Sequence, residues 1–191
     1  MRRRVLTGLA AVAVGVALGL VKGNSSGLRG AVGNLSAPWL LIGLVAGYRT
    51  TSLRRGAAAG LVATSLALLG FYLALTAVLG DQLGQGGVLH QVGKEVAANR
   101  IWFVLGMVSG PVMGAVGGSL RRRPRWLPAT VGAVLAGEIV VVAAVRGRQL
   151  LPAPLYLSWG VDDWRAYTVE CALGVLVCLV GLLRVAGSRA S

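Results

Sequence analysis

Six apolar runs, each close to the length that crosses a bilayer, constrain this sequence more than any other feature. Their approximate ranges are 5–21, 28–48, 56–79, 101–120, 127–145 and 166–183. About 20 apolar residues in a helix cross the roughly 30 Å hydrocarbon core of a membrane. None of the runs shows the alternation that a membrane strand requires. The sequence therefore predicts an all-α polytopic helix bundle, with residues 1–191 forming one transmembrane domain.

Charged residues are few, and most of them are basic. Only 13% of the residues are charged, and the net charge is +13, whereas a soluble domain carries roughly 25% charged residues. Such a balance would suggest a nucleic-acid partner for a soluble protein. Here the basic residues separate the apolar runs, so we expect them to set orientation and to attract anionic lipid. The predicted partner is the lipid bilayer, with no nucleic acid.

The residue usage also suggests an origin. All but Lys22 and Lys94 of the 19 basic residues are arginine, and Ala, Gly, Val and Leu are abundant. These residues have GC-rich codons, which indicates a bacterium with a high-GC genome. We therefore expect a multi-pass protein of the bacterial inner membrane.

The distribution of arginine predicts the topology. Twelve of the 19 basic residues lie in segments that share one side of the membrane, and those segments hold no acid. The remaining seven basic residues share the other side with Asp81, Glu95, Asp162 and Asp163. Because cytoplasmic segments are enriched in arginine and lysine, we expect both termini in the cytoplasm.

Reporter fusions test this topology. A reporter fused after Ser191 should be active in the cytoplasm, because an even number of spans returns the chain to the side on which it began. A reporter inserted in residues 82–87 should be periplasmic or extracellular. A cytoplasmic signal from the second fusion would rule out the six-span topology.

Small residues recur at helical spacing in three of the runs. In the fourth run four glycines stand four residues apart, which places them on one face of a helix. Without side chains they allow another helix to approach closely, as helix packing in membranes requires. Pro111 lies among them and should kink this helix. The predicted packing residues are Gly106, Gly110, Gly114 and Gly118, with similar seams at Gly15 and Gly19 and at Cys171, Gly174, Cys178 and Gly181.

Two acids fall inside apolar runs. Glu138 lies near the middle of the fifth run, and Glu170 lies near the outer end of the sixth. An ionised acid at the bilayer centre costs roughly 2.5–3.5 kcal/mol, so such residues commonly mark functional sites. Glu138 could be protonated, could pair with an arginine or could line a polar site. For Glu170, which lies about one turn from Arg165, pairing with an arginine at the outer end is the simpler interpretation.

The second run is interrupted by polar residues and glycines. Ser36 is a suitable N-cap with Pro38 in the first turn, so a regular helix would begin there and end by Tyr48. The preceding stretch, which includes Asn34, is then either an ordinary outer loop or part of a re-entrant or broken span. A broken helix would line a cavity and would point to a transport site. The candidate ligand-binding residues are Asn34, Ser36, Glu138 and Glu170.

No pattern of catalytic chemistry is present. The sequence contains no catalytic dyad, phosphate-binding loop or cluster of metal ligands, and its one histidine, His90, lies between runs. Cys171 and Cys178 are roughly 10 Å apart on a helix, too far for a disulfide. We therefore predict no enzymatic activity, no cofactor and no metal.

Two resemblances bear on function. The segment Gly33-Asn34-Leu35-Ser36-Ala37-Pro38-Trp39-Leu40-Leu41 resembles a family of small membrane proteins of high-GC bacteria that is classed as a domain of unknown function. In size and topology the chain is also similar to the substrate-binding S-components of energy-coupling-factor vitamin transporters. Those have six helices and a small-residue face on the first, for which Ala13 and Ala17 are suitable here. This resemblance implies a partner subunit, but no vitamin-binding motif accompanies it.

Two functions remain in competition. The broken second run, Glu138 and the proline in the fourth run favour a subunit that binds or transports a small solute. The glycine seams and the lack of catalytic groups favour a scaffold that does not transport, with a membrane protein partner or a second copy of itself. An intramembrane enzyme would require clustered acids or histidines, which the sequence lacks.

Overall fold

The structure is a computed structural model of the 191-residue chain, and it describes residues 2–23, 26–79, 87–148 and 163–190. The described residues form helices and no strands, and six helical stretches are long and apolar enough to cross a membrane. The predicted all-α bundle and its six spans are therefore confirmed. The elements are α1 (Arg2–Lys22), α2 (Gly27–Asn34), α3 (Ala37–Tyr48), α4 (Leu53–Leu79), α5 (Val88–Ala98), α6 (Arg100–Leu120), η1 (Pro124–Trp126), α7 (Leu127–Arg148) and α9 (Trp164–Ala190).

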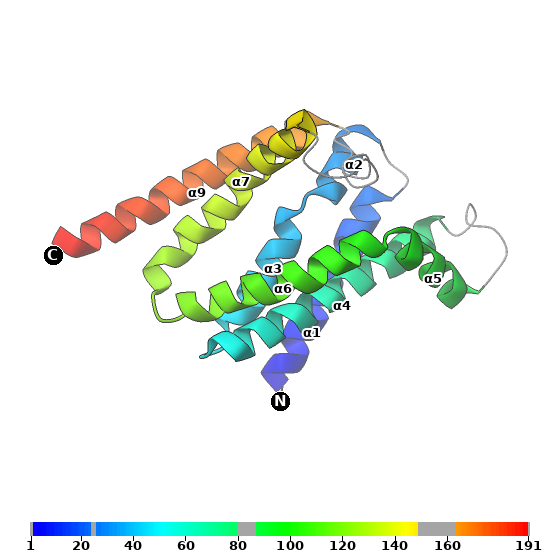
Figure 1. The fold of residues 1–191 in the computed structure, drawn as a ribbon, viewed down its shortest axis with the longest axis horizontal. Coiled ribbons are helices and arrows are strands. Elements are labelled where there is room, and N and C mark those ends of the chain that lie inside the picture. Colours follow the sequence, from blue (N-terminus) through cyan, green and yellow to red (C-terminus); the bar gives the residue numbers. More distant parts are fainter. Residues whose placement is uncertain (1, 24–25, 80–86, 149–162, 191) are drawn as a thin grey trace.

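The helices form a four-helix body and a separate hairpin (Figure 1). In the body, α4 lies at the centre and packs against α1, α3 and α6. The hairpin consists of α7 and α9, which pack along each other. It contacts the body mainly through α2 on α9 and α3 on α7. The short α2 and the first turn of α3 therefore form the joint between the two parts.

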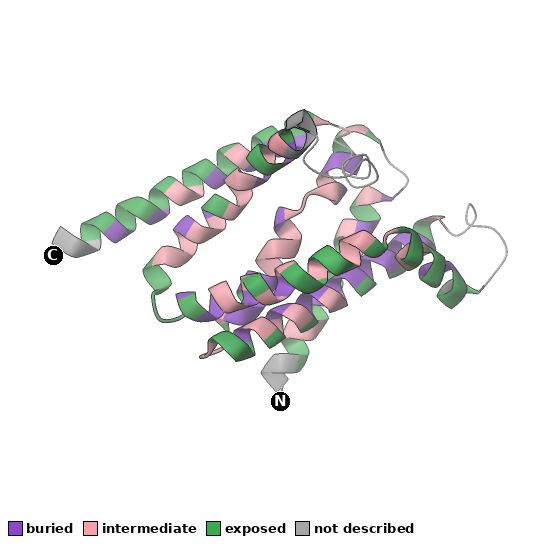
Figure 2. Ribbon diagram, viewed as in Figure 1, coloured by how far each residue is buried: buried purple, intermediate pink, exposed green. Residues whose placement is uncertain are grey.

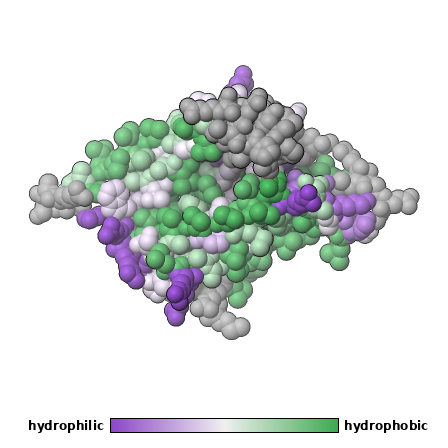
Figure 3. Space-filling view, viewed as in Figure 1, coloured by the Kyte–Doolittle hydropathy of each residue, from purple (hydrophilic) through white to green (hydrophobic). Residues whose placement is uncertain are grey.

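The surface of the bundle suits a lipid environment. Large apolar side chains are exposed along the outer faces of the helices, for example Val108 on α6, Val140 on α7 and Leu176 on α9. Most buried residues lie on α4 and on the faces turned toward it (Figure 2). Figure 3 shows a broad apolar surface, with hydrophilic residues gathered toward opposite ends of the molecule. This is the banded surface of a membrane-spanning protein.

Glycines bring α3, α4 and α6 into backbone contact. A Cβ atom on Gly114 of α6 would overlap the carbonyl oxygen of Gly56 on α4, and one on Gly47 of α3 would overlap the carbonyl oxygen of Gly114. A Cβ atom on Gly110 would lie 3.1 Å from the carbonyl oxygen of Gly60. Real side chains cannot occupy such positions without moving the helices apart. Close approach here supplies van der Waals contact, the main attraction between helices in lipid.

The two outer members of the glycine stripe contact one side chain and one carbonyl oxygen. A Cβ atom on Gly106 would meet the flexible end of the Leu68 side chain at 2.6 Å, and one on Gly118 would lie 3.0 Å from the carbonyl oxygen of Ser52. The helix runs through Pro111 without interruption. The closest backbone approach is at the centre of the stripe, where a Cβ atom on Gly60 or Gly56 would overlap the carbonyl oxygen of Gly110 or Gly114.

Similar seams join the other helix pairs. A Cβ atom on Gly15 of α1 would overlap the backbone of Ala67 on α4. In the hairpin, Gly132 of α7 faces the backbone of Cys178, and Gly174 of α9 faces that of Ala136. Both cysteines are free thiols.

An aromatic chain closes the body at its predicted outer end. The rings of Trp39, Phe71, Tyr72 and Phe103 contact one another in that order, with centroid separations of 5.1–5.3 Å. These residues come from α3, α4 and α6, and Val96 of α5 packs on the same cluster. The α5 helix, Val88–Ala98, lies between α4 and α6 in the chain and contacts both.

The stretch before Ser36 is helical and is not an ordinary loop. Gly27 begins α2 with a φ of 68°, a backbone conformation that glycine adopts without strain. The Arg29 guanidinium donates to the carbonyl oxygens of Leu20 and Val21 at 2.8 and 2.7 Å, which caps the end of α1. Gly33 lets α2 lie against the backbone of Lys22. These contacts stabilise a helix of eight residues that would be marginal alone.

The glycine contacts between α4 and α6 predict that an added methyl group destabilises the protein at Gly114 but not at Gly137. Gly114→Ala should force α6 away from α4 and lower the free energy of unfolding by about 1–3 kcal/mol. Gly137→Ala is the matched control, because a Cβ atom there meets nothing within 4 Å and alanine favours the helix by up to about 1 kcal/mol. Thermal unfolding in detergent measures both. Equal melting temperatures for the two variants would contradict this packing.

Candidate functional site

The membrane span that consists of α2 and α3 is broken at Leu35 and Ser36. Leu35 is extended, with φ −57° and ψ 134°, and α3 begins at Ala37. Pro38 has no N–H group, and the Trp39 N–H donates to the Ser36 carbonyl oxygen at 3.1 Å. The N–H groups of Ser36 and Ala37 are therefore the two donors that the helix start itself leaves without an acceptor.

Glu138 of α7 accepts from both of these donors. Its Oε1 lies 2.5 Å from the Ser36 nitrogen, and its Oε2 lies 2.7 Å from the Ala37 nitrogen. The side chain is 6% exposed. A carboxylate from the hairpin thus caps a helix of the body, at the positive end of the α3 dipole.

The membrane makes this cap energetically important. An unsatisfied backbone group in hydrocarbon costs several kcal/mol, because no water is present to bond it. The buried charge of Glu138 is costly for the same reason. The hydrogen bonds between Glu138 and the two N–H groups offset both costs at once. They satisfy the backbone donors and stabilise the buried carboxylate.

Glu170 of α9 lies beside Glu138. The two carboxyl groups interact through charge and lie within hydrogen-bonding range. Glu170 is 7% exposed, and its Oε2 has no hydrogen-bond partner among the described residues. Helix geometry agrees with this placement. Glu138 is six residues from Ala144 and Glu170 is six from Trp164, so each is about 9 Å below the predicted outer end of its span.

An apolar cluster surrounds the carboxyl pair. Ala31 of α2, Val142 of α7 and Tyr167 of α9 are fully buried and pack together, with Leu35 at the break beside them. The Trp164 and Tyr167 rings are in contact, with centroids 6.0 Å apart. This cluster excludes lipid and water from the joint, which strengthens the electrostatic interactions inside it.

The other two candidate residues lie at the break without contributing to the cap. Ser36 occupies the N-cap position, as predicted, but its side chain makes no capping hydrogen bond. Asn34 is the last residue of α2 and half-buried, and its side chain has no hydrogen-bond partner within the described part of the chain. The structure thus brings Ser36, Glu138 and Glu170 together, with Asn34 two residues away.

The predicted pairing of Glu170 with Arg165 is wrong. Arg165 is exposed while Glu170 is buried, and in the described residues no ion pair joins them. One helical turn separates the two positions along α9, but Glu170 faces the hairpin interior and α7. A sequence spacing alone does not show which face of a helix is buried.

Two components of the site were missed in the sequence analysis. The Ala37 N–H is a backbone donor that any residue except proline supplies. Tyr167 is one turn before Glu170, so a search for polar residues at helical spacing could have found it. Among the described residues no group of three His, Cys, Asp or Glu side chains could hold a metal.

Comparison of the chain with protein-family models, with curated proteins and with solved structures finds no match. The resemblances drawn from residues 33–41 and from the topology therefore stay predictions. Function has to be argued from the site itself.

Removing the Glu138 cap should destabilise the joint. Glu138→Leu leaves the Ser36 and Ala37 N–H groups unsatisfied, so we expect the free energy of unfolding in detergent to fall by about 2 kcal/mol or more. Ser36→Ala is the matched control. It keeps both donors and removes a hydroxyl that does not cap, so it should change stability by less than about 0.5 kcal/mol. A leucine variant as stable as the parent would contradict the capping role.

Proposed function

We propose that this chain is a subunit that binds or transports a small solute, with Glu138 and Glu170 as its coupling site. One observation carries the proposal. Glu138 caps a broken membrane helix with both of its oxygens, and the neighbouring Glu170 has a buried oxygen, Oε2, without a partner among the described residues. Broken helices whose N-termini meet charged groups inside the membrane are typical of transporter sites.

The charge of the site favours a cationic solute or a proton. Two carboxylates side by side repel each other, and a cation or proton between them removes that repulsion. Glu170 Oε2 has acceptor capacity that a donor on the solute would use. The half-buried amide of Asn34 adds a neutral polar group at the same break. The solute class that fits is a small amine or metal cation, or the proton alone.

The joint offers a way to couple binding to motion. A cation bound at Glu138 competes with the Ser36 and Ala37 N–H groups for the same oxygens. Weakening that cap loosens the hairpin from the body, because the hairpin contacts the body mainly through α2 and α3. Movement of one helical unit against another around a fixed site is how such transporters expose it alternately.

The scaffold interpretation has less support. Its basis is the lack of catalytic groups and the set of glycine seams, which would let a partner helix approach. The central glycines, Gly110 and Gly114, instead face α3 and α4 of the same chain. They are therefore not free for a partner.

Proteoliposomes test the proposal. Vesicles that hold the protein and a pH-sensitive dye receive an inward proton gradient, in buffers with potassium, sodium or methylammonium outside. In at least one buffer the gradient should collapse several-fold faster than in protein-free vesicles. Glu170→Gln should return the rate toward that of empty vesicles, because it removes a charge at the site without touching the cap.

Glu95→Gln is the control, since Glu95 lies on α5, where its Oε2 accepts from Asn99. It should transport like the parent. A parent protein no faster than empty vesicles in every buffer would refute the proposal. A fully active Glu170→Gln variant would show that the carboxyl pair is not the coupling site.

A further inference from the structure

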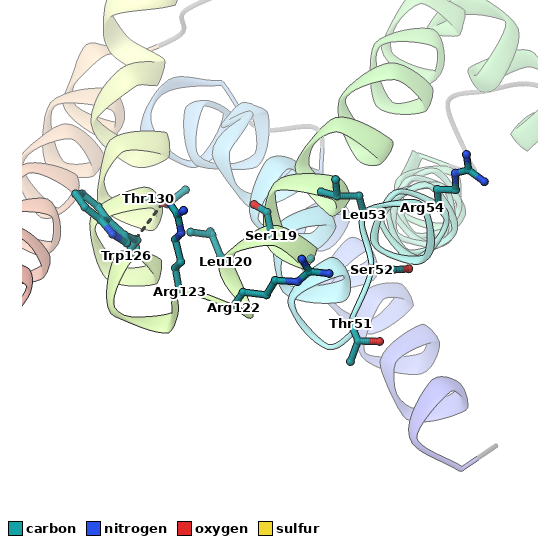
Figure 4. A pocket seen from close by; sticks show the side chains of 11 residues that line it. Thr51, Ser52, Leu53, Arg54, Ser119, Leu120, Arg122, Arg123, Trp126 and Thr130 are labelled. Atoms are coloured by element: carbon teal, nitrogen blue, oxygen red, sulfur yellow. Dashed lines mark hydrogen bonds between the residues drawn. The ribbon is translucent and has the colours of Figure 1, made fainter.

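A cavity lies at the opposite side of the membrane from the carboxyl pair. It has a volume of about 710 Å³ and opens between the start of α4, the end of α6 and the start of α7 (Figure 4). Three arginines line it, Arg54, Arg122 and Arg123, and no acidic residue does. In Figure 4 Arg122 extends toward Ser52, Arg123 lies near Thr130, and Arg54 points outward at the rim.

The guanidinium groups of these three arginines have no partner among the described residues, whereas two other arginines near this end of the bundle do. Arg49 donates to Thr7 Oγ1 at 3.0 Å, and the Arg121 guanidinium lies 6.0 Å from the centre of the Tyr48 ring. In contrast, the side chains of the three lining arginines make no hydrogen bond or ion pair with any described residue. Their donors are therefore available to a ligand.

The start of α4 adds further positive character. Ser52 Oγ accepts from the Arg55 N–H at 3.2 Å, while the N–H groups of Leu53 and Arg54 have no acceptor in the described part of the chain. No acid stands in the first turn, so nothing compensates the helix dipole, and arginine there is unfavourable without an anion. The start of a helix of this length is suited to bind phosphate.

Two hydroxyl groups that line the cavity are not free to donate to a ligand. Ser119 Oγ donates to the Val116 carbonyl oxygen, and Thr130 Oγ1 donates to that of Trp126. Their protons are thus engaged within their own helices. The donors that line the cavity are therefore the Arg122 and Arg123 guanidinium groups, the Thr51 and Ser52 hydroxyl groups and the Trp126 indole N–H, beside the α4 N-terminus. Together they suit an anion with several acceptor oxygens.

The depth of the cavity matches that of lipid headgroups. One candidate span begins at Leu53 and another ends at Leu120, and both of these residues line the cavity. A phosphate bound there would lie at the membrane surface on the predicted cytoplasmic side. Basic pockets between helices at this level are suited to anionic headgroups.

We propose that this cavity binds a phosphate group, carried either by an anionic phospholipid or by a soluble phosphate compound, through Arg122, Arg123 and the N-terminus of α4. This site is independent of the carboxyl pair. The ligand would join the α4 end of the body to the α7 end of the hairpin, and so would stabilise the folded protein in proportion to its binding.

Two probes distinguish the sources of the phosphate. In neutral detergent, inorganic phosphate is titrated against chloride at equal ionic strength while the melting temperature is measured. In nanodiscs of phosphatidylcholine, with or without phosphatidic acid, retained lipid is counted by native mass spectrometry. A rise in melting temperature with phosphate indicates a soluble ligand. Selective retention of phosphatidic acid without that rise indicates a headgroup, and either result supports the site.

Charge-matched variants test its location. Arg122→Gln or Arg123→Gln should weaken the observed binding by about 10-fold, the effect of losing one charge-assisted hydrogen bond. Arg125→Gln removes the same charge from the same connection but does not line the cavity, so it should bind like the parent. Equal weakening in all three variants would show general surface attraction and would overturn the proposal. A parent that responds to neither probe would also overturn it.

Discussion

The structure depends on how the backbone N–H groups at a break in a membrane helix find hydrogen-bond acceptors. Hydrocarbon offers no hydrogen bonds, so a helix can be interrupted in the membrane only where other groups take up its free donors. At the α2–α3 break Pro38 lacks a donor and Trp39 bonds within its own turn, which leaves two N–H groups. Glu138 takes both. One side chain thereby permits the break and fixes the hairpin to the body.

The two parts of the molecule are held together by different forces. Within the body, glycines such as Gly47, Gly56 and Gly114 allow backbone contact, and dispersion over a long interface resists separation. Between body and hairpin, the contacts centre on the capped break and on the cluster around Tyr167. Dispersion is insensitive to charge, whereas the capped break depends on the hydrogen bonds of one carboxyl group, that of Glu138. The joint is therefore the place where chemistry can change the arrangement.

Charge is also arranged across the membrane with a clear asymmetry. The buried carboxyl groups lie in the predicted outer half, next to a helix N-terminus that stabilises them. Arg122 and Arg123, which pair with no described residue, lie at the predicted inner surface and line a cavity whose lining residues include no acid. The electrostatic potential therefore favours cations at the first location and anions at the second.

The sequence by itself determined the fold class, the six spans and the importance of Glu138, because burial in lipid requires long apolar runs and makes an internal acid conspicuous. It also placed α3 at Ser36 through the Ser-Ala-Pro pattern. Only the tertiary structure decided that Gly27–Asn34 is helical, that Glu170 meets Glu138 and not Arg165, and that Ala37 is a donor to the site. The physical reason is that these features depend on which faces of distant helices meet. The spacing of residues along a helix shows which of them share a face. Which other helix packs against that face is decided by the close packing of the whole bundle.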